Sequence, residues 1–309
     1  MKAMMQMLGR WLQFLRERHE PLSLSMMVLA FFAANVGIAW LPSSESVIPW
    51  GRLGAGYVLI WLCFLHMRLF DEVKDYAVDR EFHPERPLAR GLIGLPEFGT
   101  ATLLCLLSEL AIAANLGWGV FSAYVCFLAF TLLMRMEFFV GDWLRPRLEL
   151  YAITHTFSAA LLGVQIQAVA TGQPPVLAEG SFLIFALGNW FVFNVFEFGR
   201  KTLGREEERD GVDSYSARLR PVGAVGLLSV NLALALGALW LTASIKFSQN
   251  AFQLFVPAGA ISVLVVLAGI YYIFSPDKKG ARIYRGTVTF YLLAYHVAVF
   301  GGWYSTLPR

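Results

Sequence analysis

The sequence is poor in charged residues and in cysteine, and both shortages narrow the class of protein. Charged side chains make up 15% of the 309 residues, whereas ordinary soluble domains carry about 25%. Hydrophobic residues make up 57%, and the mean hydropathy is +0.57. Cys63, Cys105 and Cys126 have no paired spacing and predict neither a disulfide framework nor a zinc site. The composition indicates an integral membrane protein.

Internal repeats and low-complexity tracts are also missing, and long apolar runs dominate instead. A helix that crosses the hydrocarbon core needs about 20 mainly apolar residues. Runs of that length predict about nine spans, near residues 22–41, 51–70, 98–116, 119–139, 151–170, 180–198, 222–243, 251–274 and 286–304. The loops between them leave no room for a separate soluble domain. We therefore expect one all-α membrane bundle over residues 1–309.

The basic residues are placed unevenly along these spans. Cytoplasmic loops of membrane proteins hold most of the Lys and Arg. With the N-terminus in the cytoplasm, all of the 25 basic residues fall on the inner side except Arg52, Lys246 and Arg309. This distribution predicts a multi-pass protein of the cell (inner) membrane with its C-terminus outside. Because the net charge of +3 is spread over these loops, no nucleic-acid partner is indicated, and no obligatory protein partner is evident.

The N-terminal stretch, residues 1–20, is basic and amphipathic. Its apolar side would carry Trp11, Leu12, Phe14 and Leu15. We expect this segment to lie along the inner leaflet of the membrane.

Carboxylates cluster just after the second span. Asp71, Asp75 and Asp79 recur at every fourth position, so on a helix all three share one face. With Glu72 they would repel one another on a bare helix. Two interpretations are open. The side chains hold Mg²⁺ or Ca²⁺ between them, or they form a solvated helix end balanced by nearby basic residues.

Basic side chains accompany these carboxylates. Lys74 lies among them, and two prolines end the helix and present Arg86 and Arg90 just beyond it. Carboxylates and arginines together suit a metal-bound polyanion, because the metal bridges acid to phosphate while guanidinium groups bind the remaining oxygens. Arg145, in a later inner loop rich in aromatics, is either an interfacial anchor or a further phosphate contact.

A second charged cluster begins at the inner end of the sixth span. Glu197 and Lys201, with Arg200 between them, form either a surface salt bridge or part of a site. The loop that follows contains Glu207 among several acids and is either solvated or metal-binding. The predicted topology puts this loop on the same membrane face as Asp71. Two acidic clusters on one cavity could hold two cations that a diphosphate bridges.

Four polar residues lie inside the apolar spans. Glu109 is at membrane depth and is either a site residue or a hydrogen-bonding partner. For His155, Gln165 and His296 we expect hydrogen bonds between helices.

The first cluster resembles a known motif. The spacing of Asp71, Asp75 and Asp79, followed by RPLARG at residues 86–91, is similar to the first Asp-rich motif of the UbiA superfamily of intramembrane prenyltransferases. That motif usually reads NxxxDxxxD with a downstream RPLxxG. The second motif of the family has aspartates at four-residue spacing. Here Asn194, Glu197, Lys201 and residues 206–208 stand in the corresponding loop, which closes with GVDSYS at residues 211–216 as the family motif does.

The resemblance implies a bundle of nine transmembrane helices with both motifs in cytoplasmic loops. It further implies that Asp75 and Asp79 bind Mg²⁺, with Asp71 in place of the usual asparagine, and that Glu197 and Glu207 stand at the second metal site. The implied reaction ionises a prenyl diphosphate in an apolar cavity and transfers the prenyl group to an acceptor. The acceptor is an aromatic acid, a quinone precursor, a haem or another isoprenoid. In a terpene cyclase of this family, the tail is its own acceptor.

A transporter is the alternative from another class. Asp75, Glu109 and Glu197 would then coordinate ions along a path. Transporters often show repeated halves and sites near the bilayer midplane, whereas here the acids cluster at one face. The sequence therefore favours the prenyltransferase.

Overall fold

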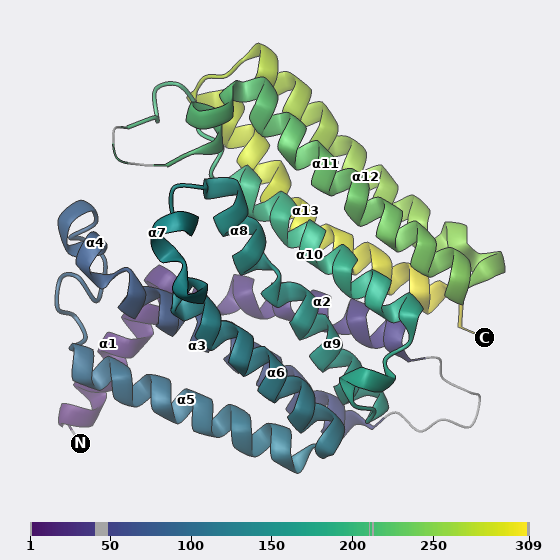
Figure 1. The fold of residues 1–309 in the computed structure, drawn as a ribbon, viewed down its shortest axis with the longest axis horizontal. Coiled ribbons are helices and arrows are strands. Elements are labelled where there is room, and N and C mark those ends of the chain that lie inside the picture. The colour runs from purple at the N-terminus through teal and green to yellow at the C-terminus, as the bar shows by residue number, and fades with distance from the viewer. Residues whose placement is uncertain (1, 41–48, 210, 212, 308–309) are drawn as a thin grey trace.

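The computed structural model describes residues 2–40, 49–209, 211 and 213–307, and this part of the chain is helical without strands (Figure 1). The α-helices are α1 (Lys2–Arg18), α2 (Pro21–Ala39), α3 (Trp50–Lys74), α4 (Tyr76–Phe82), α5 (Leu95–Asn115), α6 (Trp118–Arg135), α7 (Gly141–Leu144), α8 (Leu148–Thr156), α9 (Ser158–Thr171), α10 (Gly180–Arg200), α11 (Tyr215–Lys246), α12 (Ala251–Phe274) and α13 (Lys278–Ser305). The predicted all-α membrane bundle is confirmed.

The predicted spans correspond to long helices. Among the described residues, eight helical segments are long and apolar enough to cross a membrane, with α8 and α9 counted together as one segment. The ninth predicted span lies within α13, which is long but less apolar than the other eight. Several spans run beyond their predicted ends because the helical hydrogen bonding continues into the charged flanks. In α3, for example, it extends to Lys74.

Two groups of helices meet along α2. The first core joins α10 to α13 with one side of α2, and the second joins the other side of α2 to α3, α6 and α9. Figure 1 shows the first group at the upper right and the second at the lower left. Glycine allows pairs of helices to pack closely at two positions. A side chain at Gly56 would collide with Val169, and one at Gly199 would collide with Val288.

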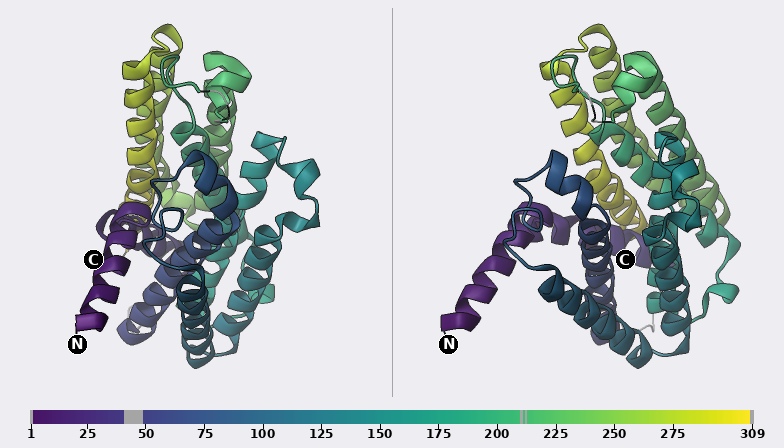
Figure 2. Two further views of the ribbon diagram at one scale, coloured as in Figure 1. Left: turned by 90° about the vertical axis from the view of Figure 1, so that its left-hand side faces the viewer. Right: turned by 60° about the vertical axis from the view of Figure 1, so that its left-hand side comes forward.

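The helix α1 reaches outward from the bundle, with the N-terminus at its far end (Figure 2). Phe14 is fully buried there and packs edge-on against Phe98 of α5, while Trp11 stacks on the same ring. Leu12 is 53% exposed on another side of the helix. Part of the predicted apolar side of this segment therefore packs on protein, which anchors α1 to α5.

The three aspartates do not lie on one unbroken helix, although Asp75 keeps a right-handed helical backbone conformation. The helix α3 ends at Lys74, Asp75 has φ −88° and ψ 0°, and the short helix α4 starts at Tyr76. Asp71 and Asp75 line the cavity described below, whereas Asp79 does not. A four-residue spacing predicts a shared face only while the helix continues unbroken.

Candidate active site

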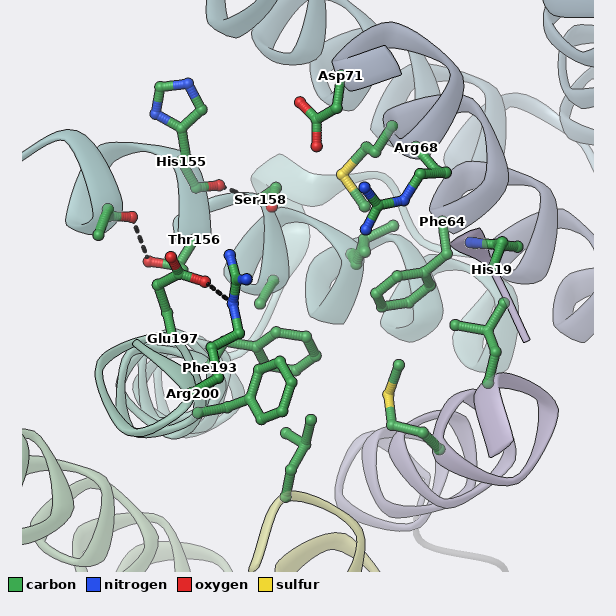
Figure 3. Close-up of a pocket in the computed structure, with 18 of the residues that line it drawn as sticks. His19, Phe64, Arg68, Asp71, His155, Thr156, Ser158, Phe193, Glu197 and Arg200 are labelled. Carbon is green, nitrogen blue, oxygen red and sulfur yellow. Dashed lines mark hydrogen bonds and ion pairs between the residues drawn. The ribbon is translucent and has the colours of Figure 1, made fainter. Parts of the chain in front are cut away.

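A cavity of about 630 Å³ opens between α2, α3, α10 and the α8–α9 segment. Its charged, histidine and tyrosine side chains are Arg18, His19, Glu20, Arg68, Asp71, Lys74, Asp75, Tyr151, His155, Glu197, Arg200 and Lys201. Phe64 lies about two helical turns before Asp71 on α3, and Phe193 about one turn before Glu197 on α10. The charged groups therefore occupy one end of the cavity, and aromatic rings lie deeper between the same helices (Figure 3).

The α3 wall of this cavity carries two carboxylates with one cation. Lys74 Nζ lies 3.6 Å from Asp71 Oδ1 and donates a 2.8 Å hydrogen bond to the hydroxyl of Tyr151. Burial raises the pKa of Asp75, against the opposing charge of Lys74, and the neighbouring charge of Asp71 raises it further. A second carboxylate beside Asp75 provides a suitable environment for a bound cation.

The third aspartate is engaged elsewhere. Asp79 is 4% exposed, does not line the cavity, and accepts a hydrogen bond from Arg86. Arg90 forms an ion pair with Glu17 of α1, with Nη1 2.8 Å from Oε2. The RPLARG loop is therefore tied to α4 and α1, and neither of its arginines lines the cavity.

The α10 wall contains the other predicted charges. Glu197, Arg200 and Lys201 come from the last turn of α10 and its C-cap, where cations are favoured by the unpaired carbonyl groups. All three line the cavity, so the structure brings this cluster together with Asp71 and Asp75.

The second acidic loop is folded against α13, away from the cavity. Glu207 forms a two-point ion pair with Arg285, and Glu206 accepts a hydrogen bond from the backbone N–H of Lys278. Glu208 accepts hydrogen bonds from the hydroxyls of Ser214 and Ser216. Arg145 is likewise paired outside the cavity, with Glu137. Neither Glu207 nor Arg145 is among the cavity-lining residues.

Several cavity residues were not predicted as site residues. Arg68 could have been found, because it precedes Asp71 by three residues and shares its helix face. Arg18, His19 and Tyr151 carry no local signal, because they reach the cavity through the packing of distant segments.

Burial lowers the pKa of His19 to about 4, with the charge of Arg68 adding to the effect. A neutral His19 is therefore expected at neutral pH.

His155 was expected to hydrogen-bond between helices, but it bonds within its own helix. Its Nδ1 donates a 2.7 Å hydrogen bond to the carbonyl of Tyr151, and the two rings stack with centroids 4.0 Å apart. The Nε2 atom is buried without a hydrogen-bond partner among the described residues.

Glu109 lies outside the cavity, in a buried network between α3, α5 and α6. Both of its oxygens lie within 2.9 Å of His66 Nδ1, and Oε2 accepts a 3.0 Å hydrogen bond from Tyr124. The other nitrogen of His66 lies 3.2 Å from the hydroxyl of Thr131. Cys63 Sγ is within 4.8 Å of these ligand atoms. Because the polar atoms of His66 and Glu109 already have partners, the network is best explained as a connection between helices.

No protein-family model matches the chain, and no curated protein matches it by sequence. Two solved structures do match it. A digeranylgeranylglyceryl phosphate synthase superposes with a TM-score of 0.64 at 14% identity, over 96% of this chain and 98% of that one. A UbiA homolog from Aeropyrum pernix K1 superposes with a TM-score of 0.58 at 16% identity, over 90% and 96%. The chain has the UbiA fold.

Within this UbiA fold, the donor chemistry of the two walls differs. Asp71 and Asp75 offer carboxylate oxygens with Lys74 as the only basic group of their own helical turn, which suits a hard divalent cation. Glu197 faces the same cavity with both oxygens held by cations. The residues of the α3 wall therefore suit a metal ion, and those of the α10 wall suit an anion.

Proposed function

We propose that the chain transfers a prenyl group from a prenyl diphosphate to an acceptor within the membrane, in a Mg²⁺-dependent reaction. One observation carries the proposal: the cavity of the UbiA-fold bundle joins paired carboxylates and basic side chains at one end to an aromatic, apolar interior. A substrate with a charged diphosphate and a hydrocarbon tail matches that division.

The α3 carboxylates would hold the metal ion. Asp71 and Asp75 are the proposed ligands, and Mg²⁺ bound there would supply positive charge to the oxygens of the leaving diphosphate. Asp79 would act by orienting Arg86 and the turn at Asp75, since its side chain lies outside the cavity. Lys74 and Arg200 would contact phosphate oxygens, because both line the charged end.

The reaction would begin with cleavage of the allylic C–O bond, whose electron pair leaves with the diphosphate. The prenyl carbocation then bonds to a carbon of the acceptor, which loses a proton. Phe64 and Phe193 stack with centroids 6.2 Å apart beside the cavity, so their ring faces can stabilise the cation while apolar neighbours exclude water.

The transporter alternative is less well supported. It required Asp75, Glu109 and Glu197 to follow one path, but Glu109 is fully buried against His66 and is not a lining residue of the cavity. The basic residues at the inner ends of the helices support a cytoplasmic orientation of the charged end of the cavity, in the cell (inner) membrane.

The proposal is tested with purified protein in lipid nanodiscs and a panel of geranyl, farnesyl and geranylgeranyl diphosphates. Each is incubated with and without Mg²⁺ and with aromatic or isoprenoid acceptors, while diphosphate release and products are measured by mass spectrometry. Mg²⁺-dependent release with a prenylated acceptor is expected. A hydrocarbon formed without acceptor would indicate a terpene cyclase instead. No release from any diphosphate would contradict the enzyme proposal.

A further inference from the structure

Both oxygens of Glu197 are engaged by cations. Oε2 accepts a 2.5 Å hydrogen bond from Arg200 Nε, and Oε1 lies 3.1 Å from Lys201 Nζ. The Glu197 side chain is 13% exposed, so water screens these ion pairs only partly. A metal ion on Glu197 would have to displace two positive groups from the same helix end. The α10 wall therefore does not fit a second divalent cation.

Arg68 adds a further cation to the cavity from α3. Figure 3 shows its guanidinium group directed into the space that Arg200 enters from α10. Arg68 Nη1 lies 3.8 Å from Oε1 of Glu72, which also accepts a 2.5 Å hydrogen bond from Arg18, and the charge of Asp71 acts on Arg68 as well. Two arginines thus share one buried carboxylate.

Because four basic residues share two acids, part of their positive charge is available to a ligand. Arg18, Arg68, Arg200 and Lys201 share the two carboxylates of Glu72 and Glu197, which leaves two positive charges uncompensated. Phosphate oxygens can accept hydrogen bonds from those N–H groups of the four cations that Glu72 and Glu197 do not use, so the ion pairs need not break.

The opposite charges come from the α3 carboxylates. Asp71 and Asp75 together with Lys74 carry one net negative charge. Five basic and four acidic residues line the cavity, with Glu20 included and Glu72 behind it not counted, so one divalent cation brings this lining to three positive charges. A fully ionised prenyl diphosphate carries about three negative charges. One metal ion therefore balances the diphosphate, and a second would leave excess positive charge in a partly buried site.

We infer that Arg68, Arg200 and Lys201 bind the diphosphate directly and replace a second metal ion, so that the site holds a single divalent cation. The inference rests on the proposed function for the prenyl part of the substrate. The binding that it describes concerns the diphosphate group alone and can be measured without turnover.

The first test is calorimetric titration of the full chain in nanodiscs with inorganic diphosphate, in EDTA without divalent cations. Arg200→Gln should weaken binding by about tenfold or more, because a charge-assisted hydrogen bond is lost. Arg200→Lys should retain most of the affinity. Arg68→Gln should also weaken diphosphate binding. Arg205→Gln is the matched control, because Arg205 lies in the adjacent loop and does not line this cavity. Equal affinity of Arg200→Gln and wild type would overturn the inference.

The variant Glu197→Gln distinguishes between two roles of Glu197, as the ion-pair partner of Arg200 and Lys201 or as a metal ligand. Removal of the acid frees Arg200 and Lys201, so metal-free diphosphate binding should become tighter by about tenfold. A metal ligand at this position predicts, in addition, a loss of metal affinity. Weaker Mn²⁺ binding in Glu197→Gln would therefore overturn the inference.

The second test counts metal ions by electron paramagnetic resonance of free Mn²⁺, with protein in excess over inorganic diphosphate. One Mn²⁺ per protein–diphosphate complex is expected, and Asp75→Asn should weaken its binding. Two Mn²⁺ of similar affinity would overturn the inference even if prenyl transfer is observed. If prenyl transfer fails while diphosphate binding keeps its dependence on Arg200, the proposed function falls and this inference stands.

Discussion

Glu207 and Arg285 form a two-point ion pair between the second acidic loop and α13. Arg285 Nη1 donates to Oε2 at 2.7 Å, and Nη2 donates to Oε1 at 2.8 Å. Glu207 Oε2 also accepts a 3.0 Å hydrogen bond from the N–H of Gly204, which holds the loop in a tight turn. Paired guanidinium–carboxylate geometry fixes direction as well as distance. The contact therefore positions the loop that follows α10.

Stability should depend on this ion pair at neutral pH and lose that dependence in acid. Hydrogen bonding to Arg285 lowers the pKa of Glu207 below its usual value of 4.5. A carboxyl group with a lowered pKa stabilises the folded state above the unfolded pKa, and the stabilisation is lost as the pH falls through the folded pKa. Glu207→Gln should cost about 1 kcal/mol at pH 7, because solvent reaches the pair.

The measurement is thermal unfolding in detergent between pH 7 and pH 3. The gap between Glu207→Gln and wild type should narrow below about pH 4.5. Glu81→Gln, at an exposed position of α4, is the control and should follow wild type throughout. A gap that stays constant down to low pH would show that the effect comes from something other than the charge of Glu207.

Asp75 and Asp79 should respond differently to neutralisation. Asp75→Asn removes a proposed metal ligand in the cavity, so the rate of diphosphate release should fall by about 10² to 10³. Asp79→Asn only weakens the contact with Arg86 outside the cavity and should reduce the rate by about tenfold. Rates from single-turnover release assays check the order. Equal losses of rate in the two variants would indicate that Asp79 also binds the metal ion.

Phe64 and Phe193, the aromatic residues deep in the cavity, should limit the length of the prenyl tail that fits. Phe193 lines the cavity and packs edge-on against Phe31, with centroids 5.5 Å apart, and against the ring of His296, with centroids 6.4 Å apart. Phe193→Ala should shift the preference toward longer prenyl diphosphates by about tenfold, because removed apolar volume becomes available to the tail. Competition between geranyl and geranylgeranyl diphosphate measures the shift.

The matched control for this substitution is Phe191→Ala. Phe191 is on the same helix and stacks on Trp190 but does not line the cavity. It should leave the preference unchanged. A parallel change in both variants would point to general loosening of α10 and would contradict the assignment of Phe193.

The buried network of His66 and Glu109 should be structural. Loss of one partner leaves a buried polar group unpaired, so Glu109→Ala should cost about 3 kcal/mol of stability. Replacing both His66 and Glu109 by leucine should cost less than the sum of the single changes, since no charge is left alone. Thermal unfolding of the singles and the double tests this. Strict additivity would mean that the two side chains do not interact energetically.

The membrane bundle and the first half of the site were predictable because their signals are local. Apolar runs of membrane-spanning length predicted the long helices, and α12 has the predicted bounds. The four-residue spacing correctly placed Asp71 and Asp75 on one wall, since α3 is helical up to Lys74. The i,i+4 spacing also indicated the contact of Glu197 with Lys201.

The partners of the remaining charges were decided only by the tertiary structure. Asp79 lies outside the cavity and accepts a hydrogen bond from Arg86. Arg285 pairs with Glu207 from 78 positions away in the sequence, and Arg18 reaches Glu72 across 54. Glu207 and Glu72 thus pair with basic groups that helix packing brings from distant parts of the chain. The sequence by itself determined a membrane bundle with acids at one end, and packing decided which of those acids remain open to a metal ion.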